Sequence, residues 1–326
     1  MKVLIAGGAG YIGSHCVKIM SEQGYDVVTV DNLSTGHQGA VKGKLYVGDI
    51  RDEAFLDDLF KKEKIDAVIH FCAKSLVGES MEKPLEYFDN NVYGTLVLLK
   101  AMAKANVKKI VFSSSAAVYG EHKEMPITEE YSTNPTSTYG ESKLMMEKMM
   151  KWAEIAHGFN YVSLRYFNVA GAYPDGSIGE DHRPETHLIP IILQAALGKR
   201  DYVKVYGTDY PTPDGTCIRD YIHVVDLIDA HIKALRYLLK GNKSEIFNLG
   251  SQDGYSVLEI IKVAREVTKI DIKQVNSERR PGDPAKLVAS SEKIGRILCW
   301  KPKFGIKEII RDAWLFHKTH PNGYEK

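Results

Sequence analysis

VLIAGGAGYIG, residues 3–13, is the stretch that decides the fold of this chain. Its first four residues form a short apolar run typical of a buried strand, and residues 11–23 repeat apolar positions with the period of a helix. The turn between them satisfies Gly-x-Gly-x-x-Gly from Gly8 and Gly-x-x-Gly-x-x-Gly from Gly7. Glycines there allow a tight turn and let a pyrophosphate approach the backbone at the helix N-terminus. Strand, turn and helix in this order therefore predict a dinucleotide site.

Apolar runs and helix-period segments keep alternating through the first half of the chain. Strands are predicted at residues 3–6, 27–30, 45–47, 67–71, 109–113 and 161–169. Helices are predicted at residues 11–23, 53–62, 85–105 and 139–157. Uninterrupted apolar strands that alternate with helices indicate a parallel sheet covered on both faces. We therefore expect an α/β fold with a doubly wound, Rossmann-type sheet.

After Gly171 the segments become shorter and turns rich in proline and glycine become more frequent. Helices are predicted at residues 188–197, 224–239, 257–267 and 306–317, and a strand at residues 245–249. We expect a dinucleotide-binding domain at residues 1–171 and a smaller α/β domain at residues 172–326. The late strand is a candidate for return to the first sheet.

The composition is that of an ordinary globular protein, with 44% hydrophobic residues and a net charge of +1 from 43 basic and 42 acidic residues. This balance argues against a broad electrostatic contact with nucleic acid or membrane, although a local basic cluster can still bind a phosphorylated small molecule. We expect no signal peptide and, without a run of about eighteen apolar residues, no transmembrane helix. The four cysteines are scattered without metal-ligand spacing. We expect a cytoplasmic protein with reduced cysteines and no metal site.

Asp31 ends the second predicted strand, eighteen residues after Gly13. A carboxylate there accepts hydrogen bonds from the adenosine ribose and repels a 2′-phosphate, which favours NAD over NADP. The alternative is that Asp31 only caps a turn with Asn32. Further cofactor contacts are expected beyond the carboxyl ends of the strands, where ligands of doubly wound sheets bind. The residues predicted from these places are Gly7, Gly10, Tyr11, Ile12, Gly13, Asp31, Asn32, Asp49, Ile50, Phe71, Cys72, Ala73, Ser75 and Asn90.

Tyr139 and Lys143 form the candidate catalytic pair, because a spacing of four residues puts both side chains on one face of a helix. A tyrosine hydroxyl has a pKa of about 10, and a neighbouring ammonium lowers that pKa toward a phenolate that can take a proton from an alcohol. Ser115, at the end of the fifth predicted strand, can pass that proton. Serines at strand ends usually only bond backbone groups, and this interpretation stays open for Ser114.

Longer motifs run in order along nearly the whole chain. They are GGAGYIGSH at 7–15, DN at 31–32, VGESMEKPLEYFDNNVYGT at 77–95, SSSAAVYG at 113–120, TYGESK at 138–143, LRYFNVAGA at 164–172, GEDHRPETHLIP at 179–190, DGTCIRDYIHVVDL at 214–227 and RRPGDPA at 279–285. In this order they resemble the extended short-chain dehydrogenase/reductase family and, within it, the UDP-glucose 4-epimerases. The resemblance implies NAD, a UDP-sugar, and reversible C4 epimerisation of UDP-glucose and UDP-galactose through a 4-keto intermediate, an isomerase reaction of galactose metabolism.

The same resemblance assigns residue roles. Tyr139 is the implied base, Ser115 its proton relay and Lys143 the cation that keeps the tyrosine ionised. The further cofactor contacts that it implies are Ser113, Ser115, Tyr139, Lys143 and Phe167. The implied substrate-binding residues are Ser115, Tyr139, Phe167, Asn168, His187, Leu188, Tyr206 on uracil, Arg219 and Arg280 on the diphosphate, Asp283 on the ribose, and Leu287 by the sugar.

Three positions depart from the family pattern. Many members carry a lysine at the position of Ser75, whereas here Lys74 is the neighbour. His187 stands where an asparagine near the diphosphate is common. Leu287 stands where some relatives have a bulky tyrosine, and the smaller side chain leaves room for a 2-acetamido group. We hypothesise that UDP-N-acetylglucosamine and UDP-N-acetylgalactosamine are also interconverted.

Alternative functions on the same fold remain to be weighed. A 4,6-dehydratase or decarboxylase needs an acidic residue just after Ser115, where this chain has Ala116 and Ala117. A UDP-uronate 4-epimerase stays open, although no group for the C6 carboxylate is evident. A catalytically silent NAD-sensing or scaffold protein is expected to have a broken serine, tyrosine and lysine set, and here the set is intact.

The resemblance also favours a homodimer through the helices at 139–157 and 85–105. The first of these helices carries more apolar side chains than one sheet contact needs, with core packing as the alternative explanation. These side chains are Leu144, Met145, Met146, Met149, Met150 and Trp152.

Overall fold

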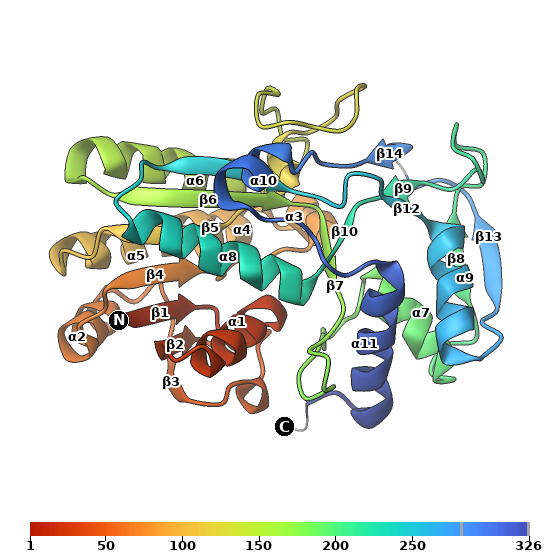
Figure 1. Cartoon of the computed structure of the whole chain (residues 1–326), viewed down its shortest axis with the longest axis horizontal. Helices are drawn as coiled ribbons and strands as arrows, with labels where there is room; N and C mark the ends of the chain where they lie inside the picture. Colours follow the sequence, from red (N-terminus) through yellow and green to blue (C-terminus); the bar gives the residue numbers. More distant parts are fainter. Residues whose placement is uncertain (281–282, 325–326) are drawn as a thin grey trace.

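A seven-stranded parallel sheet forms the centre of the protein in a computed structural model that describes residues 1–280 and 283–324 (Figure 1). The strand order is β11-β6-β5-β4-β1-β2-β3. The strands are β1 (Lys2–Ala6), β2 (Asp26–Asp31), β3 (Lys44–Val47), β4 (Ala67–His70), β5 (Lys109–Ser113), β6 (Asn160–Tyr166) and β11 (Glu245–Leu249). This confirms the predicted doubly wound sheet. The order reverses between β1 and β4, and ligands of such sheets bind beyond the strand ends at that point.

Helices cover both faces of the sheet. On one face lie α1 (Tyr11–Glu22) and α8 (Val224–Leu239), and on the other lie α2 (Glu53–Glu63), α5 (Gly94–Lys104) and α6 (Thr138–His157). Alternate residues of β1 point to opposite faces, so Val3 and Ile5 join one core cluster while Leu4 and Ala6 join the other. The continuous apolar run of β1 is explained by burial on both sides.

A smaller second lobe packs around α7 (Leu188–Ala196), α9 (Val257–Thr268) and α11 (Ile306–Thr319), drawn on the right of Figure 1. Short strands connect it to the main sheet region, and they were not predicted because two to four residues are too few for a periodic pattern. They are β7 (Asn168–Ala170), β8 (Val203–Tyr206), β9 (Ile218–Arg219), β10 (Tyr221–His223), β12 (Tyr255–Ser256), β13 (Gln274–Ser277) and β14 (Lys286–Leu287). The remaining helix of this half is α10 (Glu292–Leu298).

Two predicted elements are divided in the structure. The helix predicted at 85–105 consists of α4 (Pro84–Tyr87), a π-helical segment (Phe88–Tyr93) and α5, and it follows the separate α3 (Val77–Glu82). The strand predicted at 161–169 ends with β6 at Tyr166, and the chain then leaves the sheet to form β7, which pairs with β10. Asn168 stabilises this new pairing, since its backbone and side-chain amides both donate to the carbonyl of Asp220.

Across residues 1–280 and 283–324, the helices are too short or too polar to cross a bilayer.

Candidate active site

The glycine turn between β1 and α1 fits a dinucleotide pyrophosphate. Gly7 has a φ of +83°, and a Cβ atom there would lie 2.7 Å from the backbone nitrogen of Cys72. A Cβ atom on Gly13 would overlap the carbonyl oxygen of Gly7. Gly10 precedes the first helical residue in an extended conformation. Without side chains on these glycines, a phosphate can approach the backbone at the start of α1 closely.

Asp31 closes the other end of the expected cofactor site. Its carboxylate accepts backbone hydrogen bonds from Ala9 and Leu33, each at 2.9 Å, and burial raises its pKa. The neighbouring Asn32 donates to Asp49 at 2.9 Å, which links the ends of β2 and β3. Ile50 is buried beside them. The predicted ribose and adenine residues therefore lie together at one edge of the sheet.

The segment after β4 lies against the glycine turn, since Phe71 and Cys72 donate backbone hydrogen bonds to the carbonyl of Ala6 at 2.8 and 3.2 Å. Ser75 is exposed, and the ammonium of the neighbouring Lys74 lies 2.5 Å from the carboxylate of Glu86.

Asn91, which the sequence analysis missed, is the buried residue that holds this segment. Its side-chain amide bonds both backbone groups of Lys74 and donates to Ser142 on α6 at 3.0 Å. Asn90 donates to Asn91 at 2.9 Å. Only the motif at 77–95 pointed to this position.

Tyr139, Lys143 and Ser115 converge where β5 ends against α6. The Lys143 ammonium donates to the carbonyl of Ser113 at 2.9 Å and lies 5.8 Å from the centre of the Tyr139 ring. The Ser115 hydroxyl accepts from the backbone of Ala117 at 3.1 Å, and its proximity to the Tyr139 hydroxyl acts to lower the pKa of that tyrosine. Ser115 therefore reaches the tyrosine while capping the short helical turn behind it.

Ser114 has a structural role instead. Its hydroxyl donates to the buried carboxylate of Glu147 at 2.6 Å, and the same carboxylate forms a two-pronged ion pair with Arg165. The hydroxyl of Ser114 is therefore used in a structural hydrogen bond within the protein, which answers the question left open for this serine.

The electrostatics of the pair differ from the expectation. Burial raises the pKa of Tyr139, and the hydrogen bond from Ser115 only partly opposes that shift. Burial also lowers the pKa of Lys143 to about 7. The expected lowering of the Tyr139 pKa by Lys143 is therefore not found in the protein alone, where desolvation disfavours the charged forms of both groups.

The residues expected to hold UDP come together in the second lobe. Arg219 and Arg280 lie 3.2 and 2.8 Å from the carboxylate of Asp283. The Arg280 guanidinium also lies over the ring of Tyr206, 5.0 Å from its centre. Leu287 on β14 pairs with Arg219 on β9. Residues separated by up to 81 positions in sequence, from Tyr206 to Leu287, thus form one cationic and aromatic group.

The remaining predicted contacts lie between these groups. Phe167 occupies the corner between β6 and β7 and packs against the cluster around Ala116 and Tyr119. Leu188 opens α7, and His187 precedes it with Nδ1 2.5 Å from Glu180.

The NAD dependent epimerase/dehydratase family matches residues 3–250. A UDP-glucose 4-epimerase from Lacticaseibacillus casei is 58% identical over 327 residues and covers 99% of both chains. A crystal structure of a UDP-glucose 4-epimerase has a TM-score of 0.99 at 56% identity, with 100% of both chains covered. The UDP-glucose 4-epimerase from Bifidobacterium longum in complex with NAD+ and UDP has a TM-score of 0.93 at 43% identity, covering 99% of this chain and 100% of that one.

Proposed function

Because the chain belongs to the NAD dependent epimerase/dehydratase family, and within it to the UDP-glucose 4-epimerases, we propose that it interconverts UDP-glucose and UDP-galactose. It is an NAD-dependent isomerase, and its usual place is galactose metabolism. The observation that carries the assignment is the convergence of Tyr139, Ser115 and Lys143 at the strand ends beside the glycine turn.

The mechanism follows from these positions. NAD held by the glycine turn and Asp31 would supply the hydride acceptor and donor for C4 of the sugar. Tyr139 takes the proton of the 4-hydroxyl, directly or through Ser115, and gives it back to the inverted centre. Lys143 would hold the nicotinamide ribose when NAD is bound, and it contributes positive charge beside the tyrosine when protonated. The 4-keto sugar rotates in the pocket between the two hydride transfers, while its nucleotide stays fixed.

The anchor for that nucleotide is the second-lobe group. Arg219 and Arg280 hold the diphosphate with their planar guanidinium groups. To do so, they exchange their ion pairs with Asp283 for hydrogen bonds to phosphate oxygens. Tyr206 stacks on uracil and Asp283 binds the ribose. In this proposal residues 1–171 hold NAD and residues 172–326 hold the UDP-sugar, with β11 of the second part completing the first sheet.

The direct test is incubation of the purified protein with NAD and UDP-galactose, followed by chromatographic separation of the nucleotide sugars. We expect UDP-glucose to form, and UDP-galactose to form in the reverse assay. No interconversion in either direction would refute the proposal. Turnover of UDP-glucuronate in their place would identify a uronate 4-epimerase.

Leu287 is proposed to admit 2-acetamido sugars. It is only partly buried, and it is held on the strand beside Arg219 near the diphosphate group. We expect turnover of UDP-N-acetylglucosamine by the wild-type protein and loss of that turnover in Leu287→Tyr, while UDP-galactose is still converted. Complete inactivity of the wild type toward both hexosamine nucleotides would contradict this role.

We also propose a cytoplasmic homodimer. Core packing explains part of the apolar character of α6, since Leu144, Met146 and Met150 are buried. Trp152 and Ile155, however, are 68% and 65% exposed. These two side chains stand one turn apart on the solvent face of α6, which packs beside α5. A second copy of the chain is the partner that covers them in this proposal. The location is supported by the four cysteines, each of them a free thiol.

A further inference from the structure

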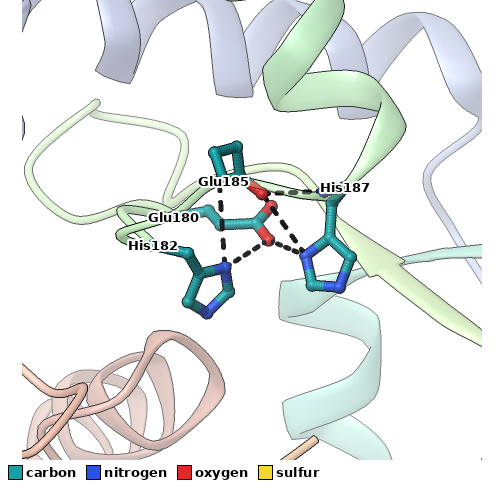
Figure 2. Close-up of side chains that lie close together, drawn as sticks. All are labelled: Glu180, His182, Glu185 and His187. Carbon is teal, nitrogen blue, oxygen red and sulfur yellow. Dashed lines mark hydrogen bonds and ion pairs between the residues drawn. The ribbon is translucent and has the colours of Figure 1, made fainter. Parts of the chain in front are cut away.

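Four metal-ligand side chains from residues 180–187 point to one spot (Figure 2). They are Glu180, His182, Glu185 and His187, and their ligand atoms all lie within 4.8 Å of one another. We call them the 180–187 cluster. Both of its carboxylates are buried, with side chains 3% exposed, whereas its two imidazoles are partly open to solvent.

The distances within the cluster suit a small cation at its centre. One oxygen of Glu180 lies 2.5 Å from Nδ1 of His187 and 3.1 Å from Nδ1 of His182. The oxygens of Glu185 lie 3.8 Å from both of these nitrogens. Tetrahedral zinc with bonds of about 2.0–2.2 Å separates neighbouring ligand atoms by roughly 3.4 Å, and the observed separations lie on both sides of that value.

The plain alternative is a set of ion pairs between two histidinium ions and two carboxylates. In that arrangement Glu180 has close imidazole partners, whereas both ion-pair distances of Glu185 are 3.8 Å. The close partners of Glu185 are the backbone amides of residues 186 and 187. The two carboxylates also repel each other, because both are buried and their oxygens lie within 4.8 Å of the same two imidazoles. A divalent cation offsets both negative charges at once and uses each of the four ligands.

We propose that the 180–187 cluster binds one divalent transition-metal cation, for which Zn²⁺ is the best fit. Two imidazole nitrogens and two carboxylate oxygens form the mixed ligand set that zinc accepts, whereas magnesium and calcium prefer oxygen alone. Four protein ligands close the coordination shell, so the ion is structural. A cavity of about 210 Å³ bordered by three of the four residues and by His317 lets the ion enter.

The spacing of the four cysteines predicts no metal site, because the ligands of this cluster are histidines and glutamates. The pattern here is Glu-x-His-x-x-Glu-x-His, which follows neither a helical nor a strand period, and only the loop conformation turns its side chains inward. The cluster also faces the glycine turn, since the ring of His182 meets that of Tyr11 edge-on with centres 6.3 Å apart. A bound ion would therefore fix the loop that carries His187 and Leu188 against the cofactor side of the molecule.

The test uses the full chain, produced without a polyhistidine tag, stripped with a chelator and titrated with Zn²⁺ by calorimetry. We expect one zinc per chain and a higher melting temperature on binding, because a ligand that binds only the folded state stabilises it. His182→Gln and Glu185→Gln should each weaken zinc binding at least about tenfold. His317→Gln is the matched control, since it alters the same cavity wall outside the cluster and should bind zinc as the wild type does.

Absence of zinc uptake by the wild type, or equal affinity in both cluster variants, would overturn the proposal. Should the variants fail to fold, Co²⁺ added to the stripped wild type gives a second measurement. Intense visible bands of four-coordinate cobalt are expected, and the weak spectrum of six-coordinate cobalt would overturn the site. None of these measurements depends on the epimerase reaction.

Discussion

Tyr139 lies where desolvation and charge act in opposite directions. Burial keeps its hydroxyl protonated, while a base at sugar C4 must be ionised near pH 7. Lys143 alone does not resolve the conflict, because burial brings its own pKa to about 7 and half of the ammonium is lost there. Ionisation of Tyr139 therefore depends on the positive charge that gathers when the cofactor is bound.

Tyr139→Phe removes the proposed proton acceptor and little else. We expect turnover of UDP-galactose to fall by about 10²–10⁴-fold, the usual contribution of a positioned acid or base. NAD binding should persist, because the glycine turn and Asp31 are untouched. Steady-state assays and NAD content of the purified variant measure the two effects. Wild-type activity would refute the assignment of the base.

Lys143→Met tests the charge itself. Removing the ammonium should move the pH optimum of turnover upward, because Tyr139 then loses a neighbour that favours its phenolate. An unchanged pH profile would count against that role.

The same variant should fold more stably near neutral pH. The pKa of Lys143 is about 7 when folded and 10.5 when free, so the folded state is penalised for its charge fully below pH 7 and no longer above pH 10.5. We expect Lys143→Met to exceed the wild type by about 1–3 kcal/mol at pH 6–7, with the difference shrinking toward pH 10. Denaturant unfolding at several pH values measures it. If the stability of Lys143→Met relative to the wild type grew as the pH rose, it would contradict a lowered pKa of Lys143 in the folded state.

At the scale of elements, the site depends on how α6 is fixed against the sheet. The carboxylate of Glu147 on α6 joins Ser114 at the end of β5 to Arg165 on β6, and all three side chains are buried. Gly140 lets the start of the same helix approach Ala117, since a Cβ atom there would lie 2.6 Å from its carbonyl oxygen. Together with the hydrogen bond from Lys143 to Ser113, these contacts fix the position of the helix.

Glu147→Gln removes one partner of that ion pair and leaves Arg165 buried without its countercharge. Loss of one member of a buried pair costs about 3–5 kcal/mol, so we expect the free energy of unfolding to fall by roughly 3 kcal/mol. Asp58→Asn is the control, because its pairing with Lys61 is exposed and contributes little. Equal losses in the free energy of unfolding, measured in urea, would show that the buried ion pair contributes no more to stability than the exposed one.

At the scale of the whole molecule, α5 and α6 each have one apolar face buried in the core and other apolar side chains exposed to solvent. In α6, Met146 and Met150 face the sheet, while Trp152 and Ile155 face outward. Leu96 on α5 and Tyr93 just before it are also exposed, at 39% and 46%. Helices that are apolar on two sides indicate a partner surface.

Trp152→Glu and Ile155→Glu place charges on that surface without touching the core. We expect the wild type to have twice the mass of the chain in light scattering after gel filtration, and each variant to shift toward the monomer. Leu239→Glu is the control, since Leu239 is a partly exposed leucine on α8, across the sheet. A monomeric wild type would contradict the dimer.

The sequence by itself determined the features that local geometry dictates. A glycine is required where Gly7 adopts a positive φ and where Gly13 touches the turn, so the cofactor turn was readable from residue type alone. Apolar runs on buried parallel strands predicted the central sheet for the same reason. The place of Asp31 at a strand end followed from those two features.

Only the tertiary structure decided what depends on distant neighbours. The approach of Arg219, Arg280 and Asp283 joins segments that are far apart in the chain, and no local period encodes it. The pKa values of Tyr139 and Lys143 come from burial, which a sequence spacing does not measure. The inward turn of the 180–187 cluster likewise results from a loop conformation. Periodicity reports contacts within an element, whereas convergence and desolvation arise from packing between elements.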